Sequence, residues 1–130
     1  MFDHVGFEVT DLARSAAFYD ALMLRIGGRR MHEAPAAIAY GRTRASLWIV
    51  QRGSPPTAPA TTPAGATGYG HMALAASGRA AVDAAHAAGI AAGGTDDGPP
   101  GLRPQYGPRY YAGYLRDPDG FRVEVVSGGD

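Results

Sequence analysis

The chain has 130 residues, a length that suits one domain or two small repeated units sharing a core. Twelve arginines balance twelve acidic residues, and there is neither lysine nor cysteine. The missing lysine excludes Schiff-base chemistry on a side chain. The missing cysteine excludes disulfides, thiolate nucleophiles and thiolate-bound metals. The neutral charge balance argues against nucleic acid as a partner.

Hydropathy predicts no contact with a membrane. No apolar run approaches the roughly 20 residues of a membrane-spanning helix. The chain opens on a strand-like segment and not on a basic stretch followed by an apolar one, so no signal peptide is predicted. We therefore expect a cytoplasmic protein.

The first elements in chain order are a strand, a helix and two more strands. Alternating apolar residues predict a strand over residues 2–9. Apolar residues spaced by three or four predict a helix over residues 11–25, with Thr10 or Asp11 as its N-cap. Two short strands are predicted around residues 36–41 and 45–51.

Two segments rich in glycine and proline punctuate the chain. Residues 53–68 carry no charge and no large apolar side chain, which is typical of a linker or surface loop. This linker separates module one (about residues 1–52) from module two (about residues 69–127). The second segment, residues 96–108, interrupts module two. Its part from 97 to 108 is either a lid over a cavity or an ordinary surface loop.

Module two repeats the order of elements in module one. A strand is predicted over residues 70–76, then a helix over 79–88 with Ser77 and Gly89 as its caps. Strands over residues 110–116 and 121–127 are joined by the turn sequence Asp-Pro-Asp-Gly at 117–120. The matching order of elements predicts an internal αβ repeat. Whether the two halves also share a functional site is left open by this pattern.

Three strands each carry one possible metal ligand opposite their apolar face. In the first strand, His4 lies opposite the apolar residues Val5, Phe7 and Val9. In the equivalent strand of module two, His71 lies opposite Met72 and Leu74. In the last strand, Glu124 lies opposite the apolar face in the same way. Two imidazoles and one carboxylate suit a divalent ion with open coordination positions, and the set does not distinguish Fe, Mn, Ni, Zn and Co. The alternative is that these histidines are structural.

Three motifs in register resemble the vicinal oxygen chelate superfamily, which includes glyoxalase I, extradiol dioxygenases, fosfomycin-resistance enzymes and bleomycin-binding proteins. They are DHVGFEVTDLARSAAFYDAL at 3–22, GHMALA at 70–75 and YLRDPDGFRVEVV at 114–126. The resemblance implies an α+β fold: two tandem βαβββ modules form a curled mixed sheet around a metal or ligand cavity. It also implies a homodimer, in which one site draws ligands from one subunit or from two.

The resemblance assigns His4, His71 and Glu124 as ligands of one divalent metal ion. The fourth ligand position of glyoxalase I falls near Trp48, which cannot bind a metal, so the set resembles that of extradiol dioxygenases. Tyr114 matches the extradiol tyrosine and is the candidate catalytic residue. The position of the extradiol catalytic histidine falls at residues 105–107, which are Gln, Tyr and Gly.

Two functions remain open at this point. The first is a metal-dependent enzyme of glyoxalase or dioxygenase type, whose small substrate chelates the metal through adjacent oxygens in a lyase, isomerase or oxygenase step. The second is a bleomycin-resistance-like protein that binds a small molecule without catalysis. The candidate substrate-binding residues are Trp48 and Tyr110, with Arg122 and Arg116 as possible clamps for a carboxylate. Packing or solvated surface is the alternative for each.

Overall fold

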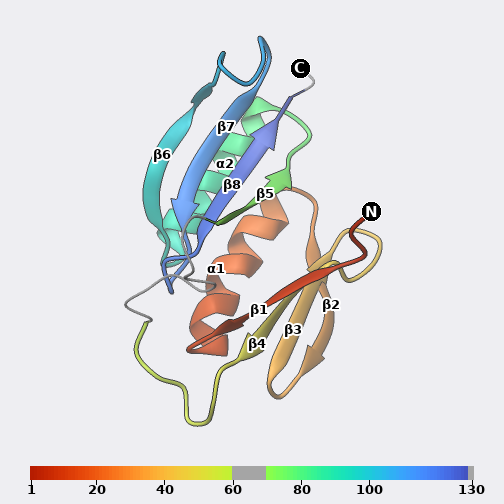
Figure 1. Ribbon diagram of the computed structural model, residues 1–130, viewed down its shortest axis with the longest axis vertical. Helices are drawn as coiled ribbons and strands as arrows, with labels where there is room; N and C mark the ends of the chain where they lie inside the picture. Colours follow the sequence, from red (N-terminus) through yellow and green to blue (C-terminus); the bar gives the residue numbers. More distant parts are fainter. Residues whose placement is uncertain (60–69, 129–130) are drawn as a thin grey trace.

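Each half of the chain folds into a strand, a helix and three further strands, as Figure 1 shows for the computed structural model. Residues 1–59 and 70–128 are described. The elements are β1 (Val5–Val9), α1 (Leu12–Arg25), β2 (Arg29–Ala34), β3 (Ala37–Gly41), β4 (Leu47–Gln51), β5 (His71–Ala75), α2 (Arg79–Ala91), β6 (Thr95–Leu102), β7 (Tyr111–Arg116) and β8 (Arg122–Ser127). This confirms the α+β class and the two tandem βαβββ modules.

The two modules have the same sheet topology. The strand orders are β1-β4-β3-β2 and β5-β8-β7-β6. In each sheet the first strand pairs in parallel with the last, and the remaining neighbours are antiparallel. The parallel register places His71 opposite Arg122 and Ala73 opposite Glu124. Because side chains alternate along a strand, His71 and Glu124 therefore share one face of the second sheet.

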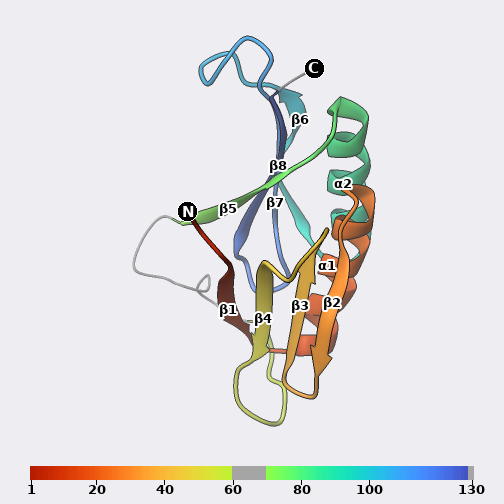
Figure 2. The same ribbon diagram turned by 90° about the vertical axis from the view of Figure 1, so that its right-hand side faces the viewer.

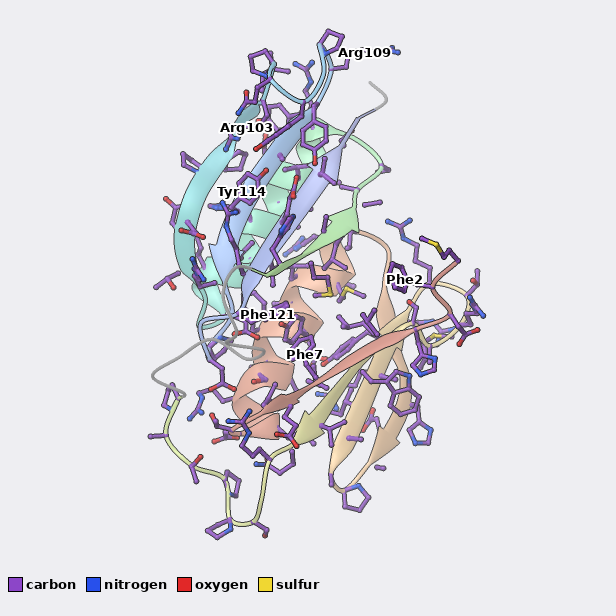
Figure 3. All side chains as sticks on the ribbon, viewed as in Figure 1. Phe2, Phe7, Arg103, Arg109, Tyr114 and Phe121 are labelled. Atoms are coloured by element: carbon purple, nitrogen blue, oxygen red, sulfur yellow. The ribbon has the colours of Figure 1, made fainter. Side chains whose placement is uncertain are left out.

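Both helices lie on the same side of the sheets, to the right of the strands in Figure 2. The main core is where α1 and α2 pack against each other and against their sheets; its fully buried members include Phe18, Leu22, Val82 and Leu115. Phe7 of β1 stacks on Phe121 at a ring-centre distance of 4.7 Å, which adds a direct contact between the modules (Figure 3). Neither helix in the described part of the chain has the length and apolar content of a membrane span.

The ends of α1 agree with the sequence expectation, whereas both caps of α2 differ from it. Asp11 caps α1, accepting a hydrogen bond from the Arg14 backbone N–H at 3.1 Å. Gly78, not Ser77, is the N-cap of α2, and α2 continues past Gly89 to Ala91. Gly89 serves close packing: a Cβ there would lie 2.5 Å from Leu115 Cδ1 and 3.2 Å from Phe18 Cε2.

Two strands of the expected βαβββ modules, β2 and β6, were not located by a sequence pattern of their own. Residues of β2 are mostly exposed and charged, so they show no apolar alternation. β6 occupies part of the segment predicted as a lid or surface loop, and that prediction is wrong for residues 97–102. Prolines within β6 donate no N–H group, and this strand lies at the sheet edge with register shifts around Gly98. The extended conformation of β6 therefore comes from its backbone pairing with β7 and not from an alternation of apolar residues.

The predicted linker is only partly described. Residues 53–59 form neither helix nor strand, and the Thr57 N–H donates to the Thr10 carbonyl at 2.9 Å. The rest of the linker prediction, residues 60–68, lies outside the described residues.

Candidate functional site

Most of the predicted site residues line one cavity on the face of the second sheet that points away from α2. We call it the module-two cavity, and its volume is about 460 Å³. Five residues that the sequence or the family resemblance singled out contribute to its wall: His71, Tyr110, Tyr114, Arg122 and Glu124. A volume of this size suits a small molecule.

His71 and Glu124 form the polar centre of the module-two cavity. His71 Nε2 lies 3.2 Å from Glu124 Oε2, and the side chains are 30% and 3% exposed, respectively. Tyr110 Oη donates a hydrogen bond of 2.5 Å to the other carboxylate oxygen, Oε1. Both oxygens of this buried carboxylate are therefore engaged, and Oε2 is directed toward the imidazole.

Two tyrosines next to Glu124 keep their protons at neutral pH. Burial raises the pKa of Tyr110 well above its usual range, and the hydrogen bond to Glu124 raises it further. Burial also raises the pKa of Tyr114, and the negative charge of Glu124 adds to the effect. Both hydroxyls are consequently hydrogen-bond donors in this cavity.

One carboxylate engages the two arginines proposed as substrate clamps. Arg122 Nε lies 2.8 Å from Asp97 Oδ2, and Arg116 Nε lies 3.1 Å from the same oxygen. The Arg122 guanidinium carbon also lies 4.2 Å from the ring centre of Tyr114. Asp97, on β6, therefore fixes both arginines and compensates part of their charge.

His4 and Trp48 lie outside the module-two cavity. His4 precedes β1, its side chain is 58% exposed, and its Nδ1 lies 2.8 Å from Asp3 Oδ1. Trp48 lies on β4 opposite Gly6, and the centre of its ring system lies 5.3 Å from the His32 ring centre.

A second cavity of about 590 Å³, here called the inter-strand cavity, has both His4 and His71 in its lining. Its other walls are mainly apolar and include Phe2, Val5, Phe7, Met72 and Leu74.

The donors fit a divalent metal ion in part. Ligands about 2.1 Å from one ion, at angles between octahedral and tetrahedral values, are about 3.0–3.4 Å apart. The 3.2 Å between His71 Nε2 and Glu124 Oε2 matches adjacent ligands of one ion. Within residues 1–59 and 70–128, however, no three His, Asp or Glu side chains form a group that could hold a metal. The expected meeting of His4 with His71 and Glu124 is therefore not observed within one chain.

β6 and the following loop contribute cavity residues that no sequence pattern predicted. Asp97, Gly98, Arg103, Gln105 and Tyr106 all line the module-two cavity. No periodic pattern in this glycine- and proline-rich segment marks its residues as cavity-facing. The only available signal was the alignment of residues 105–107 with the extradiol catalytic histidine, and two of these three residues reach the cavity.

His86 also has a defined place, behind the cavity wall. It lies on α2 and is buried. Its Nε2 lies 3.0 Å from Asp96 Oδ1 and 3.0 Å from the Tyr114 carbonyl oxygen. His86 therefore tethers α2 to β6 and β7 from the side of the core and does not line the cavity.

Comparisons with known proteins identify the family. Residues 1–125 match the family described as "Glyoxalase/Bleomycin resistance protein/Dioxygenase superfamily". No curated protein sequence matches the chain significantly. A glyoxalase/bleomycin resistance protein from Albidiferax ferrireducens T118 is 33% identical, with 97% of each chain covered and a TM-score of 0.74.

Two further solved structures share the fold. A lactoylglutathione lyase from Agrobacterium tumefaciens is 26% identical over 96% of this chain and 91% of that chain, with a TM-score of 0.64. A fosfomycin resistance protein from Mesorhizobium loti is 18% identical over 99% and 92%, with a TM-score of 0.68, a likeness of fold alone. The family match and these structures agree with the two-module fold. The chain belongs to the glyoxalase/bleomycin resistance protein/dioxygenase superfamily.

Proposed function

We propose that the protein is a divalent-metal-dependent enzyme acting on a small substrate that chelates the metal through adjacent oxygens. The observation that carries this proposal is the His71–Glu124 pair, whose nearest donor atoms are 3.2 Å apart in the wall of a small-molecule-sized cavity. Tyr110 supports it, because its hydrogen bond fixes the carboxylate from behind.

Each of these residues of the module-two cavity would have a separate role. His71 Nε2 and Glu124 Oε2 would hold the ion, and Tyr110 would keep the carboxylate oriented. A bound divalent ion supplies Lewis-acid stabilisation of negative charge on a substrate oxygen. Tyr114 would donate a hydrogen bond from its Oη to the substrate.

We propose that a second copy of the chain completes the site. His4 is exposed and the inter-strand cavity beside it is mainly apolar, as expected for a surface that another subunit covers. β1 and β5 are edge strands of their sheets in the described part of the chain. In a homodimer built on these edges, His4 of one copy would join His71 and Glu124 of the other.

A lyase or isomerase step is favoured over ring-cleaving oxygenation. Gln105 and Tyr106 line the cavity where the extradiol resemblance requires a histidine, and neither replaces an imidazole as acid and base. The similarity to a lactoylglutathione lyase supports the same choice.

The second candidate function is small-molecule binding without a metal. It is favoured by the observation that one chain, over its described residues, brings together only two donors. In that case the tyrosines and arginines of the module-two cavity would bind the ligand directly.

Metal stoichiometry separates the two candidates. The protein is purified without added metal and then titrated with Fe(II), Mn(II), Ni(II), Co(II) and Zn(II) in separate experiments. The enzyme proposal expects about one ion per chain, abolished by His71→Ala and by Glu124→Ala and retained by His32→Ala. Binding below about a tenth of an equivalent for every ion would leave the binding protein as the function.

A further inference from the structure

Arg103 differs from the other two arginines near Tyr114 in its partners. Arg116 and Arg122 both contact Asp97. Arg103 donates from Nη2 to the Pro99 carbonyl at 2.7 Å and from Nη1 to the Leu102 carbonyl at 3.4 Å. Over the described residues it has no carboxylate partner. Arg103 therefore brings an uncompensated positive charge to the module-two cavity.

The local structure holds the Arg103 guanidinium in place. Its carbon lies 5.5 Å from the ring centre of Tyr114, and Figure 3 shows both side chains over β6 and β7. Gly101 of β6 provides space for it, because a Cβ at that position would lie 3.0 Å from Arg103 Nη1. An arginine fixed by carbonyl oxygens and an aromatic ring is oriented before any ligand arrives.

The donors that remain on Arg103 suit an anion. A guanidinium has five N–H groups in a planar fork, and the two carbonyl bonds use only part of them. The fork matches the spacing of two oxygens of a carboxylate or phosphonate group. The two carboxylates of the cavity, Asp97 and Glu124, already have contacts with a guanidinium and a hydroxyl group, respectively.

We infer that Arg103 binds an anionic oxygen group of the substrate, a carboxylate or a phosphonate, in the module-two cavity beside Tyr114. This inference rests on the proposed function, since it names the substrate class of the same site. It assigns to Arg103 the anion binding that sequence reasoning gave to Arg116 and Arg122. Those two arginines instead hold β6 to β7 and β8 through Asp97.

Three probes of similar shape test the inference: benzoate, phenylphosphonate and the neutral benzamide. Their dissociation constants are measured by ligand-observed NMR for the wild type and for Arg103→Ala, Arg103→Gln and Arg109→Ala. Arg109 is the matched control, because it lies in the same loop, is exposed and points away from Tyr114 in Figure 3. Circular dichroism establishes that each variant is folded.

We expect the wild type to bind the two anions more tightly than benzamide. Arg103→Ala and Arg103→Gln should each weaken both anions about tenfold or more and leave benzamide unchanged. Arg109→Ala should leave all three constants unchanged. The relative loss for benzoate and phenylphosphonate then indicates which anion the cavity prefers.

Several results would overturn the inference. One is a wild type that does not prefer the anions to benzamide. Another is an Arg103 variant that binds all probes as the wild type does, or that weakens anionic and neutral probes equally through lost packing on Tyr114. A third is anion binding that chelator treatment abolishes and the Arg103 variants retain, because the probe would then bind a metal ion.

Metal content measured on the same samples keeps the two proposals distinguishable. Arg103→Ala should retain the metal stoichiometry of the wild type, since Arg103 contacts neither His71 nor Glu124 in any observed hydrogen bond. A protein that binds no metal but binds anions through Arg103 would overturn the proposed function and leave this inference standing.

Discussion

Tyr19 and Asp117 join the two modules through a buried hydrogen bond. Tyr19 Oη on α1 donates to Asp117 Oδ2 in the β7–β8 turn at 2.7 Å, and 98 positions separate the two residues along the chain. The other oxygen of Asp117 accepts the backbone N–H groups of Asp119 and Phe121. The turn motif thus has a second role, as an anchor for the helix of module one.

Replacing Tyr19 with Phe should destabilise the protein by about 1–3 kcal/mol, because it leaves a buried carboxylate oxygen without its donor. The measurement is the free energy of unfolding from urea titration. Tyr106→Phe is the control, since Tyr106 is 64% exposed. Equal stabilities of Tyr19→Phe and the wild type would show that solvent or another group replaces the donor.

Asp117 should make the stability depend on pH. Burial raises the pKa of Asp117, although the hydrogen bonds from Tyr19 and two backbone N–H groups oppose the shift. A carboxyl whose folded pKa exceeds its unfolded value of about 3.9 stabilises the folded state fully below that value. This contribution is lost as the pH rises through the folded pKa.

The corresponding variant is Asp117→Asn, which does not titrate. The free energy of unfolding of the wild type, minus that of Asp117→Asn, should fall between about pH 3 and about pH 7. Urea titrations of both proteins across this range measure the difference. A difference that stays constant or grows with pH would contradict the raised pKa.

Subunit mixing tests whether His4 reaches the donor pair of another copy. His4→Ala and Glu124→Ala should each lose metal binding when prepared alone. After subunit exchange in an equal mixture, half of the dimers are mixed and each has one intact site, so about a quarter of an ion per chain should return. If the wild type binds one ion per chain and the mixture none, all ligands come from one chain.

Tyr110→Phe tests the support behind the Glu124 carboxylate. Removal of the 2.5 Å hydrogen bond should lower metal affinity about 10–100-fold, the usual effect of losing a group that orients a ligand. Tyr111→Phe is a matched control, because its hydroxyl bonds Asp83 on the other side of the sheet. Competition with a chromogenic chelator measures both affinities, and equal values for the two variants would exclude this role for Tyr110.

The sequence predicted those parts of the site that depend on strand periodicity. Alternation placed His71 and Glu124 each opposite the apolar face of its own strand, and the parallel register of β5 and β8 brings the two residues onto one face of the sheet. Arg103 and Asp97 could not be found this way, because β6 is formed by pairing with β7 and not by a pattern of its own. The separation of His4 from this pair depends on how the modules pack, which no local pattern encodes.

Gly89 limits what the contact between the two modules can accommodate. With no side chain there, α2 packs closely on Leu115 of β7 and on Phe18 of α1, which lie 2.5 Å and 3.2 Å from the position that a Cβ would take. Because such a close-packed contact has no space for one more carbon atom, an alanine at this position would have to push both side chains aside. A single methyl group on α2 would therefore disturb the packing of one helix on the other and of α2 on its own sheet.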